Sequence, residues 1–198
     1  MVLVLAAGRG LRMGGPKALM RVGGREWWRV QRDRLRAVGA REVWVVSEEV
    51  RRAWAGEAEA PAEVVVVDGC GAMMSSVWAG LVEVSKRQPG GVFVLPVDVP
   101  APGASVWSAL RGAGVRPSAP AHAGRRGHPV WLPWGFVERD VLSHADDAGW
   151  LEGMRLDRLV EGELVPVSVD DAGVLVNLND PGDVARWVAS GGSGSLGA

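Results

Sequence analysis

The 198-residue sequence contains no isoleucine, threonine or tyrosine, and only two lysines and two asparagines. Its single cysteine, Cys70, excludes an intramolecular disulfide and a zinc site built from cysteines. No apolar run approaches the roughly 18 residues that a membrane span needs. The apolar start Met1–Leu5 lacks the basic flank of a secretory signal. These absences favour a protein of the reducing cytoplasm.

An excess of charge of one sign is also missing. The sequence has 22 Lys and Arg against 23 Asp and Glu, which gives a formal net charge of -1 at pH 7. This balance provides no basic footprint for nucleic acid and no polybasic anchor for a membrane. Hydrophobic residues make up 47% of the chain, which excludes a disordered or collagen-like protein. An anionic ligand would therefore have to meet positive charge that is concentrated locally.

The scarcity of lysine and asparagine draws attention to the few that are present. Lys17 lies in a glycine-rich segment, and Asn177 and Asn179 are two residues apart. Isoleucine, tyrosine, lysine, asparagine and phenylalanine share A/T-rich codons, so we hypothesise a G/C-rich gene. A gene of average G/C content would contradict this. In a G/C-rich gene, a lysine that has not drifted to arginine is a candidate functional residue.

Buried strands and helices alternate along the first 110 residues. We predict strands at Val2–Leu5, Val43–Val46, Val64–Val67 and Val92–Leu95. We predict helices at Glu26–Val38, Arg51–Ala55, Ser75 or Ser76 to Lys86, and Ser105–Leu110. This order predicts an α/β fold, a Rossmann-like three-layer sandwich with a doubly wound, mainly parallel sheet.

Beyond Pro117 the pattern is less regular. Short strands are expected near Gly127–Leu132, Leu164–Val169 and Val174–Leu178, and helices near Gly135–Leu142, Gly153–Val160 and Pro181–Ala189. Residues 1–189 are expected to form a single domain. The Gly/Ser-rich residues 190–198 are expected to be a flexible tail.

The segment LAAGRGLRMGGPK, residues 5–17, follows the first buried strand, where ligands bind in open α/β sheets. Its glycines let the backbone approach a ligand and direct N–H groups at phosphate, while Arg9, Arg12 and Lys17 add positive charge. Met13 stands where a dinucleotide fingerprint needs its third glycine, and Ala18 stands where a P-loop needs Ser or Thr. The segment therefore predicts a polyphosphate-binding loop that belongs to neither of these two motifs. The alternative is a merely flexible loop with solvated arginines.

The longer stretch LAAGRGLRMGGPKAL resembles the signature of nucleotidyltransferases similar to the molybdenum-cofactor cytidylyl- and guanylyltransferases. The resemblance implies attack of a phosphorylated acceptor on the α-phosphorus of a nucleoside triphosphate, with release of pyrophosphate and no protein nucleophile. The implied nucleotide-binding residues of this loop are Ala6, Ala7, Gly8, Arg9, Gly10, Arg12 and Lys17.

Two later segments resemble the metal-binding motifs of the same family. In LPVDVP, residues 95–100, Asp98 matches a magnesium-binding carboxylate, and its alternative role is that of a turn aspartate. The stretch VNLNDPGDV, residues 176–184, resembles the late motif. Alternation puts Asn177 and Asn179 on one strand face, with Asn179 toward metal or phosphates and Asp180 capping the next helix. Asp180 and Gly182 depart from the family's Thr and Glu, and an amide ligates magnesium more weakly than a carboxylate.

Two further segments resemble substrate-binding parts of the family. The resemblance of residues 71–81 implies that Ser75 and Ser76 contact the nucleoside, and the alternative is that one of them caps a helix. GRRGHPV, residues 124–130, resembles a segment of the cytidylyltransferase-like members. Its Arg125, Arg126 and His128 could receive a second, anionic substrate.

The sequence thus predicts a magnesium-dependent nucleotidyltransferase in which Arg12, Lys17 and Asp98 are catalytic and Asp98 and Asn179 hold the metal. The resemblance implies molybdopterin cofactor as the acceptor, and no nucleic acid or membrane partner is expected. Ala7 predicts CTP over GTP, since guanylyltransferase-like members usually carry glycine at this position and the methyl group narrows the space for a purine. The alternatives are transfer to a sugar 1-phosphate or another small molecule, and a nucleotide-binding module without turnover.

Overall fold

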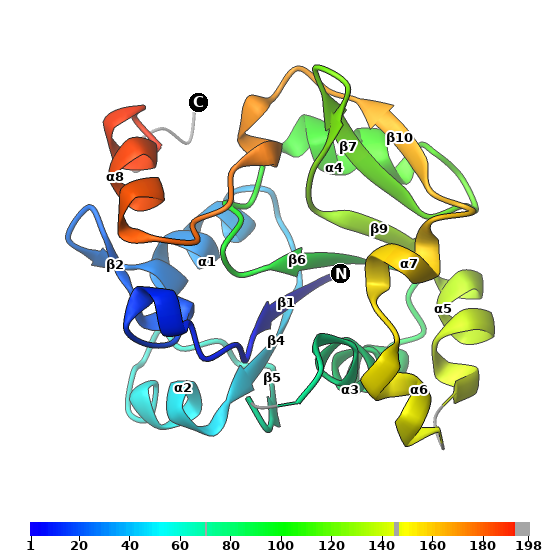
Figure 1. Cartoon of the computed structure of the whole chain (residues 1–198), viewed down its shortest axis with the longest axis horizontal. Helices are drawn as coiled ribbons and strands as arrows, with labels where there is room; N and C mark the ends of the chain where they lie inside the picture. Colours follow the sequence, from blue (N-terminus) through cyan, green and yellow to red (C-terminus); the bar gives the residue numbers. More distant parts are fainter. Residues whose placement is uncertain (70, 145–146, 193–198) are drawn as a thin grey trace.

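The computed structural model describes residues 1–69, 71–144 and 147–192 (Figure 1). One sheet has the strand order β10-β7-β9-β6-β1-β4-β5, with β8 paired to β7. Its strands are β1 (Val2–Ala6), β4 (Glu42–Ser47), β5 (Val64–Val67), β6 (Gly91–Pro96), β7 (Ser118–His122), β8 (Arg125–Arg126), β9 (Val130–Pro133) and β10 (Val165–Ser168). A separate hairpin joins β2 (Arg21–Val22) and β3 (Arg25–Glu26).

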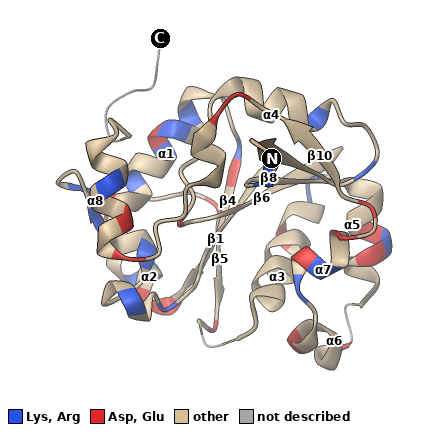
Figure 2. Cartoon of the chain, turned by 45° about the horizontal axis from the view of Figure 1, so that its top comes forward, with Lys and Arg blue, Asp and Glu red and all other residues tan. Residues whose placement is uncertain are grey.

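Helices connect these strands. They are α1 (Trp27–Ala37), α2 (Glu48–Ala53), α3 (Met73–Ser85), α4 (Ala104–Arg111), α5 (Trp134–Asp140), α6 (Ala148–Gly153), α7 (Leu156–Val160) and α8 (Pro181–Ala189). Short 3-10 turns are η1 (Leu11–Met13), η2 (Lys17–Leu19), η3 (Leu142–His144) and η4 (Ala172–Leu175). In Figure 2 acidic and basic residues are interspersed along α1, α2, α5 and α8. None of the helices in the described ranges is long and apolar enough to cross a membrane.

The sheet is mixed but mainly parallel. β1 pairs in parallel with β4 and β6, β4 with β5, and β10 with β7, whereas β9 runs antiparallel to β6 and β7. The chain leaves β1 toward β4 on one side and returns to β6 on the other. The carboxyl ends of β1 and β6 therefore form the topological switch point where α/β proteins bind ligands. The expected α/β class with a doubly wound sheet is confirmed.

Alternating side chains of the strands build two cores, one on each face of the sheet. Val2 and Val4 belong to one cluster with side chains of α1, α4 and α8, while Leu3 belongs to the other with side chains of α3, α5 and α7. Figure 1 shows α3 and α7 on the side of the sheet away from α1 and α8. A Cβ at Gly80 would lie 2.4 Å from a methyl carbon of Leu3, so α3 packs on β1 at a distance that only glycine allows.

Three local predictions are wrong. Helix α3 begins at Met73 after Ala72, so neither Ser75 nor Ser76 is its N-cap. Residues 174–178 form no strand, because the Val174 carbonyl accepts from His128 N while Leu178 N donates to the Asp98 carbonyl. These bonds go to two different segments and cannot form a ladder. The helix expected at Gly153–Val160 is divided between α6 and α7 by extended backbone at Met154 and Arg155.

The predicted flexible tail lies mostly outside the described residues. Residues 190–192 directly follow α8, where Ser190 N donates to the Arg186 carbonyl and Gly192 N to the Trp187 carbonyl. Residues 193–198 and Cys70 are not described.

Candidate active site

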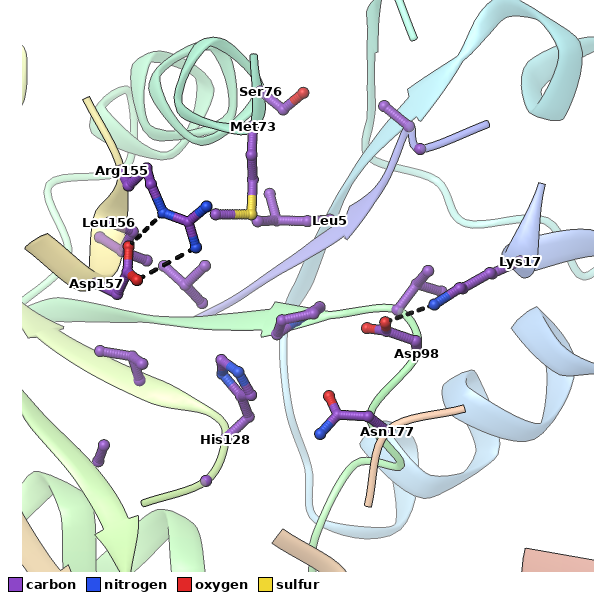
Figure 3. A pocket seen from close by; sticks show the side chains of 18 of the residues that line it. Leu5, Lys17, Met73, Ser76, Asp98, His128, Arg155, Leu156, Asp157 and Asn177 are labelled. Carbon is purple, nitrogen blue, oxygen red and sulfur yellow. Dashed lines mark hydrogen bonds and ion pairs between the residues drawn. The ribbon is translucent and has the colours of Figure 1, made fainter. Parts of the chain in front are cut away.

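A cavity of about 750 Å³ opens at the switch point (Figure 3). Its walls come from the loop after β1, the end of β6, the start of α3, the segment before β9, and α7. Polar lining residues are Lys17, Asp68, Ser76, Asp98, Arg126, His128, Arg155, Asp157 and Asn177. Polar groups from segments far apart in the chain thus meet in one cavity at the edge where a ligand is expected.

Glycines shape the loop after β1. Gly10 has φ +59°, and its carbonyl accepts hydrogen bonds from Met13 N at 2.7 Å and Gly15 N at 3.3 Å. A Cβ at Gly10 would lie 1.9 Å from the Gly15 carbonyl oxygen, whereas one at Gly14, which has φ +75°, would meet open space. The loop therefore closes on itself at Gly10 and returns to the cavity at Lys17, which begins η2.

We predict that Gly10→Ala destabilises the protein by about 3 kcal/mol, because it combines a left-handed conformation with a backbone clash. Gly14→Ala is the matched control, since it meets the same conformational penalty without the clash and should cost only about 1 kcal/mol. Urea denaturation of both variants measures the difference. Equal losses would show that the closure at Gly10 is not tight.

Lys17 joins three segments of the site. Its Nζ donates to Asp98 Oδ2 at 2.8 Å and to Asn179 Oδ1 at 2.7 Å, contacts that span 81 and 162 residues of sequence. The Lys17 and Asp98 side chains are only 18% and 21% exposed, so this ion pair is partly shielded from water. Figure 3 shows the Lys17 side chain directed at Asp98, with Asn177 on a nearby segment.

The start of α8 fixes Asn179. As predicted, Asp180 caps this helix and accepts from Asp183 N at 2.8 Å. The Asp183 carboxylate in turn accepts from Asn179 N at 2.8 Å, and this bond is the largest cause that lowers the pKa of Asp183. The Asn179 backbone is thereby tied to the first turn of α8, although the expected strand is absent.

The oxygens of Asp98 and Asn179 suit a divalent cation. Both accept from one ammonium nitrogen, so both point to a common position. Carboxylate and amide oxygens are ligands for magnesium, which proteins usually hold with one or two carboxylates and substrate phosphates. The described part of the chain contains no cluster of three His, Cys, Asp or Glu residues fit for a metal. The donor set therefore fits a metal shared with phosphates.

The other predicted site residues do not all line the cavity. Ala7, Gly8, Gly10 and Ser76 line the cavity, as do Lys17 and Asp98. Ala6 is buried at the end of β1 and is not a lining residue. Arg9, Arg12 and Ser75 do not belong to the lining, and Arg9 and Arg12 are exposed on the loop. Asn179 borders a neighbouring cavity of about 460 Å³, and Asn177 lines both cavities.

Several lining residues were not found from the sequence. Asp68 and Gly69 follow β5 as Asp98 follows β6, so the same strand-end rule could have found them. A Cβ at Gly69 would lie 2.7 Å from the Ala7 carbonyl oxygen, which marks a close approach of two loops. Arg155 pairs with Asp157 through contacts of 3.0 and 3.2 Å on the opposite wall (Figure 3). No sequence signal distinguished this pair from surface charges.

Of the GRRGHPV segment, Arg126 and His128 line the cavity and Arg125 does not. Burial lowers the pKa of His128, and the negative charge of Asp98 opposes only part of this shift. His128 Nδ1 is buried and has no hydrogen-bond partner among the described residues. Burial thus favours the neutral imidazole of His128, whose ring lines the cavity.

A doubly wound sheet with a glycine-rich loop, a lysine and a strand-end carboxylate at its switch point is an α/β arrangement that can hold an anionic ligand. The model of the MobA-like NTP transferase domain matches residues 2–161, and the chain belongs to this family. Asn177 and Asn179 lie beyond the matched region.

Solved structures share the fold over nearly the whole chain. The Rv0371c homologue of Mycobacterium sp. strain JC1 is 25% identical, with a TM-score of 0.74 and coverage of 96% of this chain and 94% of that one. Rv0371c of Mycobacterium tuberculosis in complex with manganese is 22% identical, with a TM-score of 0.70 and coverage of 96% of this chain and 97% of that one. Molybdopterin-guanine dinucleotide biosynthesis protein A of Archaeoglobus fulgidus is 20% identical, with a TM-score of 0.65 and coverage of 96% of this chain and 98% of that one. A comparison with curated proteins gives no match.

Proposed function

We propose that this protein is a magnesium-dependent transferase that moves a nucleoside monophosphate from CTP to a phosphorylated acceptor and releases pyrophosphate. The observation that carries the proposal is the contact of Lys17 Nζ with the oxygens of both Asp98 and Asn179 beneath the glycine-rich loop. This arrangement combines a cation for phosphate with oxygen ligands for a metal, which is what in-line displacement at phosphorus requires.

In this proposal the backbone of Gly8 and Gly10 and the charges of Arg9, Arg12 and Lys17 hold the triphosphate. Asp98 and Asn179 would hold the metal ion, which when bound neutralises charge that develops on the phosphate oxygens. Lys17 would supply positive charge to the phosphates, and Ser76, with Ser75 beside it, would contact the nucleoside. Attack on the α-phosphorus needs alignment and charge neutralisation more than a protein nucleophile.

We assign the acceptor to the wall formed by Arg126 and His128, and we propose a molybdopterin-type phosphomonoester. Arg126 can bind a phosphate group and neutral His128 can bond it further. The family and the A. fulgidus protein named for molybdopterin-guanine dinucleotide biosynthesis support this choice. We also propose a cytoplasmic location, which the single cysteine of the chain supports.

The test is pyrophosphate release from CTP and GTP with molybdopterin cofactor and a panel of sugar 1-phosphates, with and without magnesium. Release that needs both magnesium and molybdopterin supports the whole proposal. If pyrophosphate is released with a sugar 1-phosphate and not with molybdopterin cofactor, the proposed acceptor is wrong but the proposed reaction class stands. Nucleotide binding without any release would leave a binding module and overturn the proposal.

The base preference is a separate prediction. Ala7 lines the cavity. We propose that its methyl group takes space from a bulky base. We expect CTP to bind more tightly than GTP, since a methyl-sized difference in a pocket gives roughly 10- to 200-fold discrimination. Calorimetric titrations in magnesium measure this, and Ala7→Gly should shift the preference toward GTP. Tighter binding of GTP, or no preference, in the unchanged protein would contradict the prediction.

A further inference from the structure

Gln31 is a fully buried amide in an otherwise apolar part of the core. It lies on α1 and is 0% exposed, and the buried polar side chains among the described residues are Gln31, Arg32 and Ser118. Burial of an amide is unfavourable unless its donors and acceptor are satisfied. A hydrophobic side chain at this position would complete the core, so the partners of Gln31 indicate what the amide does.

All three partners of Gln31 are backbone groups on either side of Asp98. Its Nε2 donates to the Val97 carbonyl at 3.2 Å and to the Val99 carbonyl at 2.6 Å. Its Oε1 accepts from Ala101 N at 2.9 Å. A single side chain thus binds the chain before and after the residue whose carboxylate enters the cavity.

The same helix supports the other oxygen ligand of the site. Trp27, one turn before Gln31 on α1, also donates to the Val97 carbonyl, and its ring packs edge-on against Trp187 of α8 at 5.1 Å. Helix α8 carries the turn that ties down Asn179. Helix α1 is therefore a common support beneath both ligand-bearing segments.

We infer that Gln31 is a positioning residue that aims the Asp98 carboxylate at the metal. The inference rests on the proposed role of Asp98 and deepens it, because Gln31 does not line the cavity and acts on Asp98 only through the backbone on either side of it. The direction of the Asp98 side chain is set by its own backbone, and Gln31 restrains the carbonyls on both sides of it. Removal of such a supporting contact from a metal site typically lowers metal affinity by about 10- to 100-fold.

The experiment compares Gln31→Met with Ser118→Ala. Ser118 is equally buried and donates to the Leu110 carbonyl at 2.9 Å, so its variant also loses a buried hydrogen bond, but away from Asp98. Binding of Mn²⁺ alone is followed by electron paramagnetic resonance, binding of cytidine by calorimetry, and stability by thermal melting. We expect Gln31→Met to bind Mn²⁺ about 10-fold more weakly with unchanged cytidine affinity. Ser118→Ala should be destabilised without either binding change.

Gln31→Glu keeps the test decisive if the methionine variant does not fold. Burial raises the pKa of the introduced carboxyl, so at acidic pH it stays neutral and can still donate to the Val99 carbonyl and accept from Ala101 N. At acidic pH the ratio of the Mn²⁺ affinity of this variant to that of the unchanged protein should then be near one. The ratio should fall as rising pH ionises the introduced carboxyl, because a carboxylate is repelled by the Val97 and Val99 carbonyls. A ratio that stays constant over the pH range in which thermal melting, compared with that of the unchanged protein, shows the introduced carboxyl ionising would overturn the inference.

The outcomes separate the inference from the function on which it rests. If Asp98→Asn leaves Mn²⁺ binding unchanged, the proposed metal role of Asp98 fails. If Asp98→Asn removes binding while Gln31→Met behaves like Ser118→Ala, only the positioning role of Gln31 fails.

Discussion

Replacement of Asp98 by asparagine is expected to lower the rate of nucleotidyl transfer by about 1,000-fold or more, which corresponds to about 4 kcal/mol of transition-state stabilisation. The variant loses the one negative charge among the proposed metal ligands. Its amide keeps the shape of the carboxylate and can still accept the hydrogen bond of Lys17, so the fold should persist. Magnesium-dependent pyrophosphate release measures the rate, and thermal melting measures the stability.

Asp157→Asn is the matched control for charge. It removes the same unit of charge from the lining of the same cavity, on the opposite wall where Arg155 holds the carboxylate. A general electrostatic effect would lower both rates similarly, whereas metal binding by Asp98 predicts a far smaller effect at Asp157. Magnesium-dependent release that survives Asp98→Asn would remove this residue from the mechanism.

The sequence was most informative where residues close together in the chain decide the local structure. Continuous apolar runs such as Val43–Val46 identified the central strands, because both faces of a parallel sheet are buried. Capping by Asp180 followed from the residues next to it, since Pro181 suits the first helical position. The convergence of Lys17 and Asp98 followed from the rule that strand ends meet at one edge of the sheet.

The sequence failed where distant backbone contacts decide the structure. The segment around Asn177 alternates like a strand, yet its hydrogen bonds go to His128 and Asp98, which lie far away in the chain. A Cβ at Gly127 would lie 2.1 Å from the Val174 carbonyl oxygen, a close approach that no local pattern encodes. Gln31 was missed for the same reason, because a glutamine in a helix is usually exposed and its partners lie 66 to 70 residues away.

Replacement of Lys17 by alanine is expected to have two opposite effects on binding. Affinity for CTP should fall by about 10- to 100-fold, the value of a hydrogen bond from a charged group, while affinity for cytidine should hardly change. The reason is that an ammonium is a point charge suited to phosphate and offers nothing specific to a base. Calorimetry with CTP and cytidine measures the difference, and equal losses for both ligands would contradict the proposed phosphate role.

The second effect concerns the metal and follows from the contacts of Lys17 with Asp98 and Asn179. Its ammonium lies 2.8 Å from Asp98 Oδ2 and 2.7 Å from Asn179 Oδ1, so it competes with a divalent cation for the same two oxygens. Lys17→Ala should therefore bind free Mn²⁺ more tightly than the unchanged protein, even though it binds CTP more weakly. Lys17→Arg is the control that keeps the positive charge, and its broad, planar guanidinium should restore CTP binding only in part. If Lys17→Ala bound Mn²⁺ no more tightly than Lys17→Arg and the unchanged protein, the ammonium would not compete for the metal position.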